Sequence, residues 1–217
     1  MTQRRFSWLG VCRYVLLAGM GLAQALSLAW PWGGQGRAWG GLQLLALAAG
    51  LALLAGSHST LGLRARFWQG FCRGWCFATA WLVGVFWWLY ISMHTYGGLP
   101  AWLAALAVLL LAGFLALYYA LAWGLWQAGR TRMGAAWQVL FFGALWLLAE
   151  LCRGVIFTGF PWGALGYAHV DTPLAGYAPW LGVYGISALA ACLSALLWQV
   201  GGLLLGLRSG VSQAHAR

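Results

Sequence analysis

The sequence contains very little charge, and charge of one sign is almost missing. Of its 217 residues only 6% are charged, lysine does not occur, and the acidic residues are Glu150 and Asp171 alone. A soluble domain of ordinary composition carries about 25% charged residues. Since the chain is also 63% hydrophobic, it has too few charged residues to form the surface of a water-soluble protein. The composition therefore excludes a soluble globular protein.

Clusters of metal ligands and catalytic side chains are also missing. Cys72 and Cys76 have helical spacing, but no histidine or acidic residue accompanies them, so the sequence predicts no metal site and no cofactor. There are no paired carboxylates, no Ser-His-Asp set and no phosphate-binding glycine loop. Basic patches with interleaved aromatics, which would indicate nucleic-acid binding, do not occur outside the apolar segments.

Long apolar segments dominate instead. A helix needs about 20 apolar residues to cross a bilayer, and six segments qualify, at roughly 13–30, 38–57, 73–93, 101–127, 134–153 and 181–206. The first has the basic start and the Ala-Gln-Ala of a signal peptide, but five further apolar segments favour an uncleaved span. The sequence predicts an all-α membrane protein with about six transmembrane helices in one polytopic domain, residues 1–217.

The arginines indicate how these spans are oriented. With the amino terminus in the cytoplasm, the cytoplasmic segments hold Arg4, Arg5, Arg64, Arg66, Arg73, Arg130, Arg132, Arg208 and Arg217. The outer loops hold Arg37, and Arg153 lies at a helix end. This asymmetry agrees with the positive-inside rule. Because six is an even number, we expect both termini in the cytoplasm.

The rare residue types gather in one stretch, Ala149–Gly185, which holds both acidic residues and three of the five prolines. In the predicted orientation residues 155–180 form an aromatic outer loop, and residues 87–100 form a second. Loops this apolar are tolerated in the headgroup region or folded between helices. We therefore expect an aromatic, lipid-facing surface on the outer side of the membrane.

Two pairs of polar residues in this stretch each allow two interpretations. Glu150 and Arg153 share a helix face, where they either form an ion pair that fixes the helix end or allow Arg153 to meet a lipid phosphate. His169 and Asp171 could serve acid–base chemistry, but no nucleophile is placed beside them. The Asp-Thr-Pro sequence is equally typical of a turn or a helix cap.

Two motifs in these loops resemble the membrane domain of the apolipoprotein N-acyltransferase family. In that family a W-x-Y-x-S-x-x-x-x-G-G-x-P stretch is followed by E-x-x-R, T-G-F-P-W, G-Y and P-x-x-G-x-x-x-x-S. Here the first pattern is filled by Trp88, Tyr90, Ser92, Gly97, Gly98 and Pro100. The others are filled by Glu150, Arg153, Thr158, Gly159, Phe160, Pro161, Trp162, Gly166, Tyr167, Pro179, Gly182 and Ser187.

The resemblance implies a multi-pass protein of the bacterial inner membrane that takes part in lipoprotein biosynthesis. Family members move an acyl chain from a phospholipid donor, through a cysteine thioester, to the amino-terminal diacylglyceryl-cysteine of an apolipoprotein acceptor. As candidates for contact with lipid or substrate we take the charged and aromatic residues of the two motifs: Glu150, Arg153, Phe160, Trp162, Tyr167, Trp88, Tyr90 and His94.

The resemblance does not extend to the catalytic residues. In the family a Glu-Lys-Cys triad lies in a nitrilase-like domain, and a sequence without lysine cannot supply that triad. We expect no catalytic residue here and no activity of this chain alone, and a separately encoded nitrilase-like domain is a candidate partner. The alternatives are a stand-alone membrane anchor for a polyprenol-phosphate mannosyl transferase, or a small transporter, which the lack of charge at mid-membrane disfavours.

Overall fold

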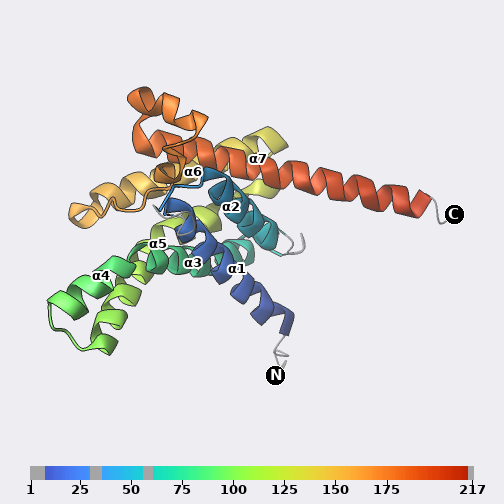
Figure 1. Ribbon diagram of the computed structural model, residues 1–217. Coiled ribbons are helices and arrows are strands. Elements are labelled where there is room, and N and C mark those ends of the chain that lie inside the picture. Colours follow the sequence, from blue (N-terminus) through green and yellow to red (C-terminus); the bar gives the residue numbers. More distant parts are fainter. Residues whose placement is uncertain (1–7, 30–35, 56–60, 215–217) are drawn as a thin grey trace, which may run out of the picture.

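The computed structural model describes residues 8–29, 36–55 and 61–214, which are almost entirely helical (Figure 1). The long helices are α1 (Trp8–Leu28), α2 (Gly40–Ala55), α3 (Leu63–Val85), α5 (Ala101–Gly129), α6 (Ala135–Val155) and α7 (Ala178–Ala214). A short helix α4 (Trp87–Ile91) and a π-helical turn η1 (Ser92–Tyr96) follow α3. The 3-10 turns are η2 (Arg130–Arg132), η3 (Ile156–Thr158), η4 (Leu165–His169) and η5 (Pro173–Tyr177).

The predicted all-α membrane fold is confirmed. Among the described residues four helices are long and apolar enough to cross a bilayer, and α3 with α4 and η1 makes five if that bent pair is one span. Helix α2 has 16 residues, about 24 Å at 1.5 Å per residue, against a hydrocarbon core of about 30 Å. The total of six spans and the cytoplasmic placement of the termini stay predictions.

The third span differs most from its predicted range of 73–93. Helix α3 begins at Leu63 and ends at Val85, and the chain bends by 52° before α4 and η1. The break falls at Phe86, whose backbone leaves the helical region (φ −95°, ψ 12°). No proline is near this position, and Gly84 lies two residues before it. The Phe86 ring packs edge-on against Phe160, at 5.0 Å between centroids, so a contact from beyond α6 accompanies the bend.

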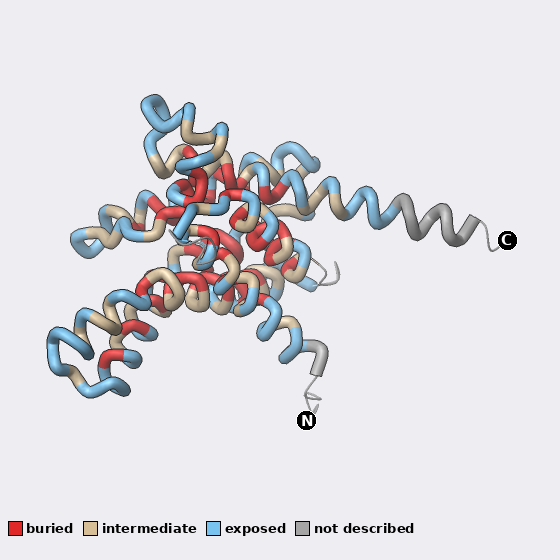
Figure 2. Tube along the Cα trace, in the orientation of Figure 1, coloured by how far each residue is buried: buried red, intermediate tan, exposed pale blue. Residues whose placement is uncertain are grey.

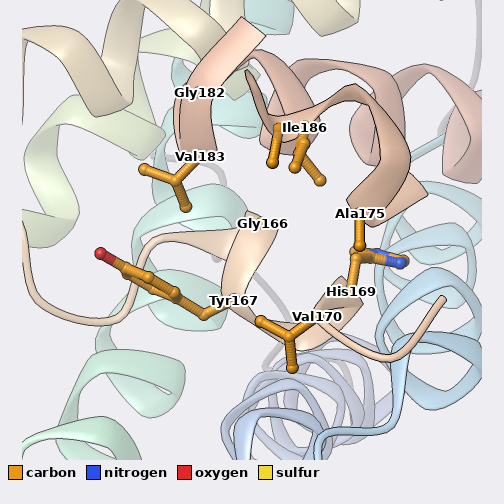
Figure 3. A pocket seen from close by; sticks show the side chains of 9 residues that line it. Gly166, Tyr167, His169, Val170, Ala175, Gly182, Val183 and Ile186 are labelled. Atoms are coloured by element: carbon orange, nitrogen blue, oxygen red, sulfur yellow. The ribbon is translucent and has the colours of Figure 1, made fainter. Parts of the chain in front are cut away.

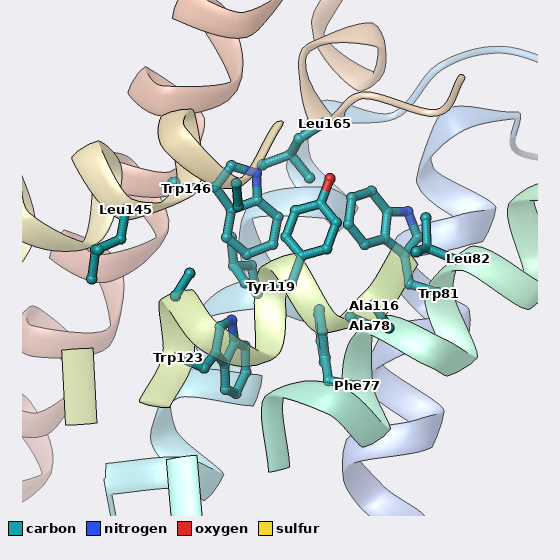
Figure 4. Close-up of a cluster of buried hydrophobic side chains, with 14 of the residues drawn as sticks. Phe77, Ala78, Trp81, Leu82, Ala116, Tyr119, Trp123, Leu145, Trp146 and Leu165 are labelled. Carbon is teal, nitrogen blue, oxygen red and sulfur yellow. The ribbon is translucent and has the colours of Figure 1, made fainter. Parts of the chain in front are cut away.

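Aromatic rings form the centre of the core, where α3, α5 and α6 meet (Figure 4). Trp81 of α3 lies edge-on to Tyr119 of α5 at 5.0 Å, and Tyr119 lies 5.0 Å from Trp146 of α6. One turn away, Phe77 stacks on Trp123 at 5.1 Å. Ring pairs at these distances add about 0.5–1.5 kcal/mol each beyond the area that they bury.

Helices α3 and α5 approach closely because glycine occupies the contact. A Cβ on Gly70 would lie 2.6 Å from the carbonyl oxygen of Trp123, and one on Gly74 would lie 2.6 Å from its Cβ. Membrane helices use small residues in this way to let their backbones approach. Figure 2 shows the outcome: buried residues concentrate where the helices cross, and the outer faces and residues 202–206 of α7 are exposed.

Two arginines donate hydrogen bonds to carbonyl groups at the carboxyl-terminal end of the short helix α2. Arg73, whose predicted cytoplasmic side stays a prediction, lies within α3 because that helix starts early. Its Nη1 donates to the carbonyl oxygen of Leu54 at 3.1 Å. Arg130 Nη2 donates to the carbonyl oxygen of Ala55 at 3.1 Å. The last carbonyls of a helix have no partner within it, and guanidinium groups supply one here.

A glycine-to-alanine pair tests the close contact of α3 and α5. Gly74→Ala places a methyl group against Trp123 and should destabilise the fold by about 1–3 kcal/mol, as overpacking does. Gly19→Ala is the control, because a Cβ at this helical position meets nothing within 4 Å. Thermal unfolding in detergent measures both variants. Equal melting temperatures for the two would contradict the packing.

Candidate functional site

The candidate site is formed by residues 156–177, which join the end of α6 to the start of α7 and are hereafter called the α6–α7 connection. It consists of η3, η4, η5 and the turns between them. Hydrogen bonds within each 3-10 turn satisfy only part of this irregular backbone. The remaining partners come from side chains of the flanking helices, and these side chains include Glu150 and Arg153.

Arg153 holds the first part of the connection. Its side chain is fully buried, and its Nη1 donates to the carbonyl oxygens of Phe160 at 2.8 Å and Trp162 at 2.6 Å. The Arg153 carbonyl oxygen in turn accepts the backbone N–H of Phe160 at 2.8 Å. The Thr-Gly-Phe-Pro-Trp turn is therefore fixed to the last turn of α6 by three hydrogen bonds.

Glu150 holds the second part. Its carboxylate is fully buried, and Oε1 accepts the backbone N–H of Leu165 at 2.9 Å and the indole N–H of Trp146 at 3.1 Å. From α7, Ser187 Oγ accepts the backbone N–H of Gly166 at 2.8 Å. Turn η4 is thus bound from both sides, by α6 through Glu150 and by α7 through Ser187.

Two interpretations were open for Glu150 and Arg153, a direct ion pair or a contact of Arg153 with a lipid phosphate, and within the described residues the ion pair is not the arrangement found. In the part of the chain that the structure describes, the hydrogen bonds of both charged groups go to the connection and to neighbouring aromatic residues. The Arg153 guanidinium also lies 5.9 Å from the centroid of the Tyr119 ring. An isolated buried charge is energetically unfavourable, and hydrogen bonds reduce that cost. The bonds to the connection therefore stabilise the buried charges of Glu150 and Arg153 and at the same time fix the connection.

The turn after α6 has a strained backbone. Phe157 and Thr158 have positive φ angles of 55° and 68°, and Gly159 follows at 78°. Such angles are uncommon for residues other than glycine, above all for β-branched threonine, and cost of order 1–3 kcal/mol each. The Arg153 hydrogen bonds offset part of this strain. Strain of this kind is concentrated at functional sites.

The aromatic residues of the connection are partly exposed. Phe160 is half-buried between Phe86 and Trp162, whose ring lies 5.3 Å away. Trp162 and Tyr167 are 55% and 48% exposed. Their backbones are held by Arg153 and by η4, while their rings remain available to lipid or substrate.

A cavity of about 250 Å³ lies between η4 and the beginning of α7 (Figure 3). Tyr167, Val170, Val183 and Ile186 line it. Gly182, also part of the lining, breaks α7 with φ 61° and ψ −176°, a conformation essentially limited to glycine. The break separates the first turn of α7 from the rest of that helix, at the edge of the cavity.

His169 anchors η4 to α2 and does not pair with Asp171. Its ring is buried, with Nε2 2.8 Å from Gln43 Oε1 and Nδ1 3.3 Å from Thr172 Oγ1. Asp171 is exposed. A Cβ on Gly40 would lie 2.5 Å from His169 Nδ1, so α2 begins directly against the imidazole. The structure therefore does not bring His169 and Asp171 together as a hydrogen-bonded pair.

The candidate residues fall into two groups. Glu150, Arg153, Phe160, Trp162 and Tyr167 come together in the connection, whereas Trp88, Tyr90 and His94 lie on the arm that α4 and η1 form (Figure 1). On that arm His94 Nδ1 is 2.7 Å from the carbonyl oxygen of Leu99, and its ring is 5.4 Å from that of Tyr90. The Phe86–Phe160 contact joins the base of the arm to the connection.

Three residues important to this geometry were missed as site residues. Trp146 stands one helical turn before Glu150, a spacing that could have identified it as a partner. Ser187 was recognised only as part of a motif. Gln43 gave no sequence signal, because its contact with His169 joins residues that are 126 positions apart in the sequence.

Comparison with known proteins agrees with the motifs. Residues 21–196 match the family described as apolipoprotein N-acyltransferase N-terminal domain. A relative from Verminephrobacter eiseniae, named apolipoprotein N-acyltransferase, is 57% identical over 182 residues, which cover 82% of this chain and 32% of the relative. A protein of that name from Ralstonia nicotianae is 52% identical over 162 residues, which cover 73% of this chain and 29% of the Ralstonia protein. The chain thus spans about a third of the length of these relatives.

Replacing Glu150 tests its role in holding η4. Glu150→Leu removes the acceptor of two buried N–H groups, each worth about 1–3 kcal/mol when left unsatisfied, and should lower the melting temperature and speed proteolysis within residues 156–177. Glu150→Gln retains an acceptor oxygen and should cost less. Asp171→Leu is the control for removing an acidic residue, since Asp171 is exposed. Equal protease sensitivity of Glu150→Leu and wild type would refute the role.

A pH series tests the burial of His169. Burial lowers the pKa of His169 below its ordinary value of 6.5, so the unfolded chain takes up a proton before the folded protein does. Its stabilising contribution is therefore complete above about pH 6.5 and is lost as the pH falls below that value. Melting temperatures between pH 8 and 5 should decline less steeply in His169→Gln than in wild type. Parallel curves would contradict this assignment.

Proposed function

We infer the function from the family: this chain belongs to the apolipoprotein N-acyltransferase N-terminal domain family, and we propose that it is the membrane part of such an acyltransferase. The complete enzyme transfers an acyl chain from a phospholipid to the amino-terminal diacylglyceryl-cysteine of a lipoprotein. It acts at the outer face of the bacterial inner membrane. This chain supplies the surface on which the lipid substrates are held.

The binding of the α6–α7 connection by buried charges is the observation that supports this role. A membrane anchor needs only apolar helices, whereas this chain places its one buried carboxylate and the Arg153 guanidinium against an irregular, strained turn. Fixing a turn so firmly is useful when the side chains on it must meet a substrate in one geometry. Trp162 and Tyr167 are the exposed rings on that turn.

Arg153 acts in this proposal as a positioning residue. Its Nη1 is already bonded to two backbone carbonyls and its side chain is buried, which favours holding the turn over direct contact with a lipid phosphate. Phe160, Trp162 and Tyr167 contact acyl chains or headgroups from the connection. Trp88, Tyr90 and His94 contribute from the α4 arm.

The covalent chemistry requires residues outside this sequence. The family resemblance assigns it to a Glu-Lys-Cys triad, and the 217 residues contain no lysine. The thioester is formed in a nitrilase-like domain, which receives the acyl chain from the phospholipid bound at this surface. The 217 residues by themselves do not transfer acyl groups.

A chimera tests the proposal. This chain replaces the matching segment of the Verminephrobacter eiseniae relative, and acylation of a diacylglyceryl-cysteine peptide is measured in phospholipid vesicles. We expect the chimera to be active and the 217-residue chain alone to be inactive. Arg153→Leu should lower the rate by up to about 100-fold through misplacement of the turn. Trp162→Ala should raise the phospholipid concentration needed for half-maximal rate.

Trp137→Ala is the matched control, because Trp137 is 69% exposed near the opposite end of α6 from the connection. Its rate should equal that of the unmodified chimera. A normally folded Arg153→Leu or Trp162→Ala chimera with unchanged kinetics would reject the role of the connection. Acylation by the isolated chain would reject the assignment of the chemistry to another domain.

A further inference from the structure

We propose that a buried water molecule is bound among Tyr119, Glu150 and Arg153, beneath the α6–α7 connection. Tyr119 comes from α5, and the two charged residues come from α6. All three side chains are fully buried. Four of their polar atoms have no hydrogen-bond partner within the part of the chain that the structure describes: Tyr119 Oη, Glu150 Oε2, and Nε and Nη2 of Arg153.

The three side chains converge on one place. Trp146 donates its indole N–H to Glu150 Oε1 at 3.1 Å, and its ring lies 5.0 Å from that of Tyr119. The Arg153 guanidinium lies 5.9 Å from the centroid of the same Tyr119 ring. In Figure 4 the Tyr119 hydroxyl lies at the Leu165 end of the aromatic cluster, and the Leu165 backbone N–H donates to Glu150 Oε1 at 2.9 Å. The hydroxyl, the carboxylate and the guanidinium are therefore neighbours.

The unpartnered atoms determine the chemistry of the molecule that binds there. Arg153 Nε and Nη2 can only donate, Glu150 Oε2 accepts, and the Tyr119 hydroxyl can do either. A bound molecule must therefore accept from the guanidinium and donate to the carboxylate. Because the charges of Glu150 and Arg153 are opposite, the site favours a neutral molecule, and its fully buried surroundings favour a small one. Water meets these conditions, and a buried water typically makes about three hydrogen bonds.

A bound water also accounts for how the two charges are arranged. Glu150 and Arg153 share a face of α6, yet their direct hydrogen bonds go to other groups. Tyr119 and Arg153 are close enough for the guanidinium charge to act on the hydroxyl, but the two do not meet in the geometry of a hydrogen bond. A water molecule joins neighbouring polar groups of this kind nearly as well as a direct bond does.

The water extends the fixation of the connection to a further helix. Arg153 holds the Thr-Gly-Phe-Pro-Trp turn and Glu150 holds η4, and both residues belong to α6. A bridge to Tyr119 Oη ties them to α5, through a residue of the aromatic core. The position of the connection then depends on one hydroxyl group of α5 as well as on α6. This inference concerns the folded chain and does not depend on acyl transfer.

X-ray radiolytic labelling of the unaltered 217-residue chain in mild detergent tests for the water, because hydroxyl radicals formed at a bound water modify the side chains beside it. Trp126 is the matched control for Trp146. Both indoles are fully buried, and both N–H groups have protein acceptors, Glu150 Oε1 for Trp146 and the Gln138 carbonyl oxygen for Trp126. We expect Trp146 and Tyr119 to be labelled at least about tenfold faster than Trp126, since only they adjoin the bound water. Equal labelling rates would overturn the proposal.

Removal of the Tyr119 hydroxyl distinguishes a bridged group from an unpaired one. Tyr119→Phe keeps the ring and should lower the melting temperature and speed proteolysis within residues 156–177, because the water loses a partner. If the hydroxyl is unpaired, its removal should instead raise the melting temperature. Tyr118→Phe is the control, because Tyr118 is half-buried and lines a hollow with Leu121 and Cys152, and it should melt as wild type does. A melting temperature of Tyr119→Phe at or above that of wild type would also overturn the proposal.

Neither measurement involves acyl transfer, so failure of the water site and failure of the proposed function are distinguishable.

Discussion

Hydrogen bonds from two charged side chains to backbone determine where the α6–α7 connection lies. Irregular backbone at membrane depth must be satisfied by the protein itself, because lipid offers no partners. Glu150 accepts from the N–H of Leu165, and Arg153 donates to the carbonyls of Phe160 and Trp162. Acceptor and donor stand one helical turn apart on α6, so one short segment of helix serves both kinds of unsatisfied backbone group.

The same principle operates at the carboxyl-terminal end of α2. There Arg73 and Arg130 donate to the last carbonyls of a helix that is too short to cross the membrane alone. Arg130 also lies over the rings of Trp126 and Trp198, at 5.4 and 5.8 Å from their centroids, and these contacts stabilise a partly desolvated cation. In the sequence these arginines indicated the orientation of the spans. In the structure they also donate hydrogen bonds to backbone carbonyls.

Hydropathy predicted the fold because it measures the apolar character of a segment, and the same apolar character places helices in lipid. The starts of α5 and α6 agree with the predicted segments to within one residue of 101 and 134. Glu150 and Arg153 were identified as a site because charge is so rare in this chain. Their partners were not, since which backbone groups approach them depends on how the connection folds back on α6.

Other features could not be found by any local pattern. The bend at Phe86 has no proline near it, and it coincides with a ring contact to Phe160, which is distant in sequence. The early start of α3 was hidden by Arg64, Arg66 and Arg73, which lower the local hydropathy although they lie on a continuous helix. His169 and Gln43 meet only because η4 packs on α2. Each depends on tertiary packing.

The unequal lengths of the helices have a consequence for the surrounding bilayer. Helix α5 has 29 residues, about 43 Å of helix at 1.5 Å per residue, and so exceeds a hydrocarbon thickness of about 30 Å by about 13 Å, whereas the 16-residue α2 falls short of it. Overlong helices tilt and short ones draw the headgroups inward. From these lengths we expect the bilayer around the domain to be thinner beside α2 than beside α5.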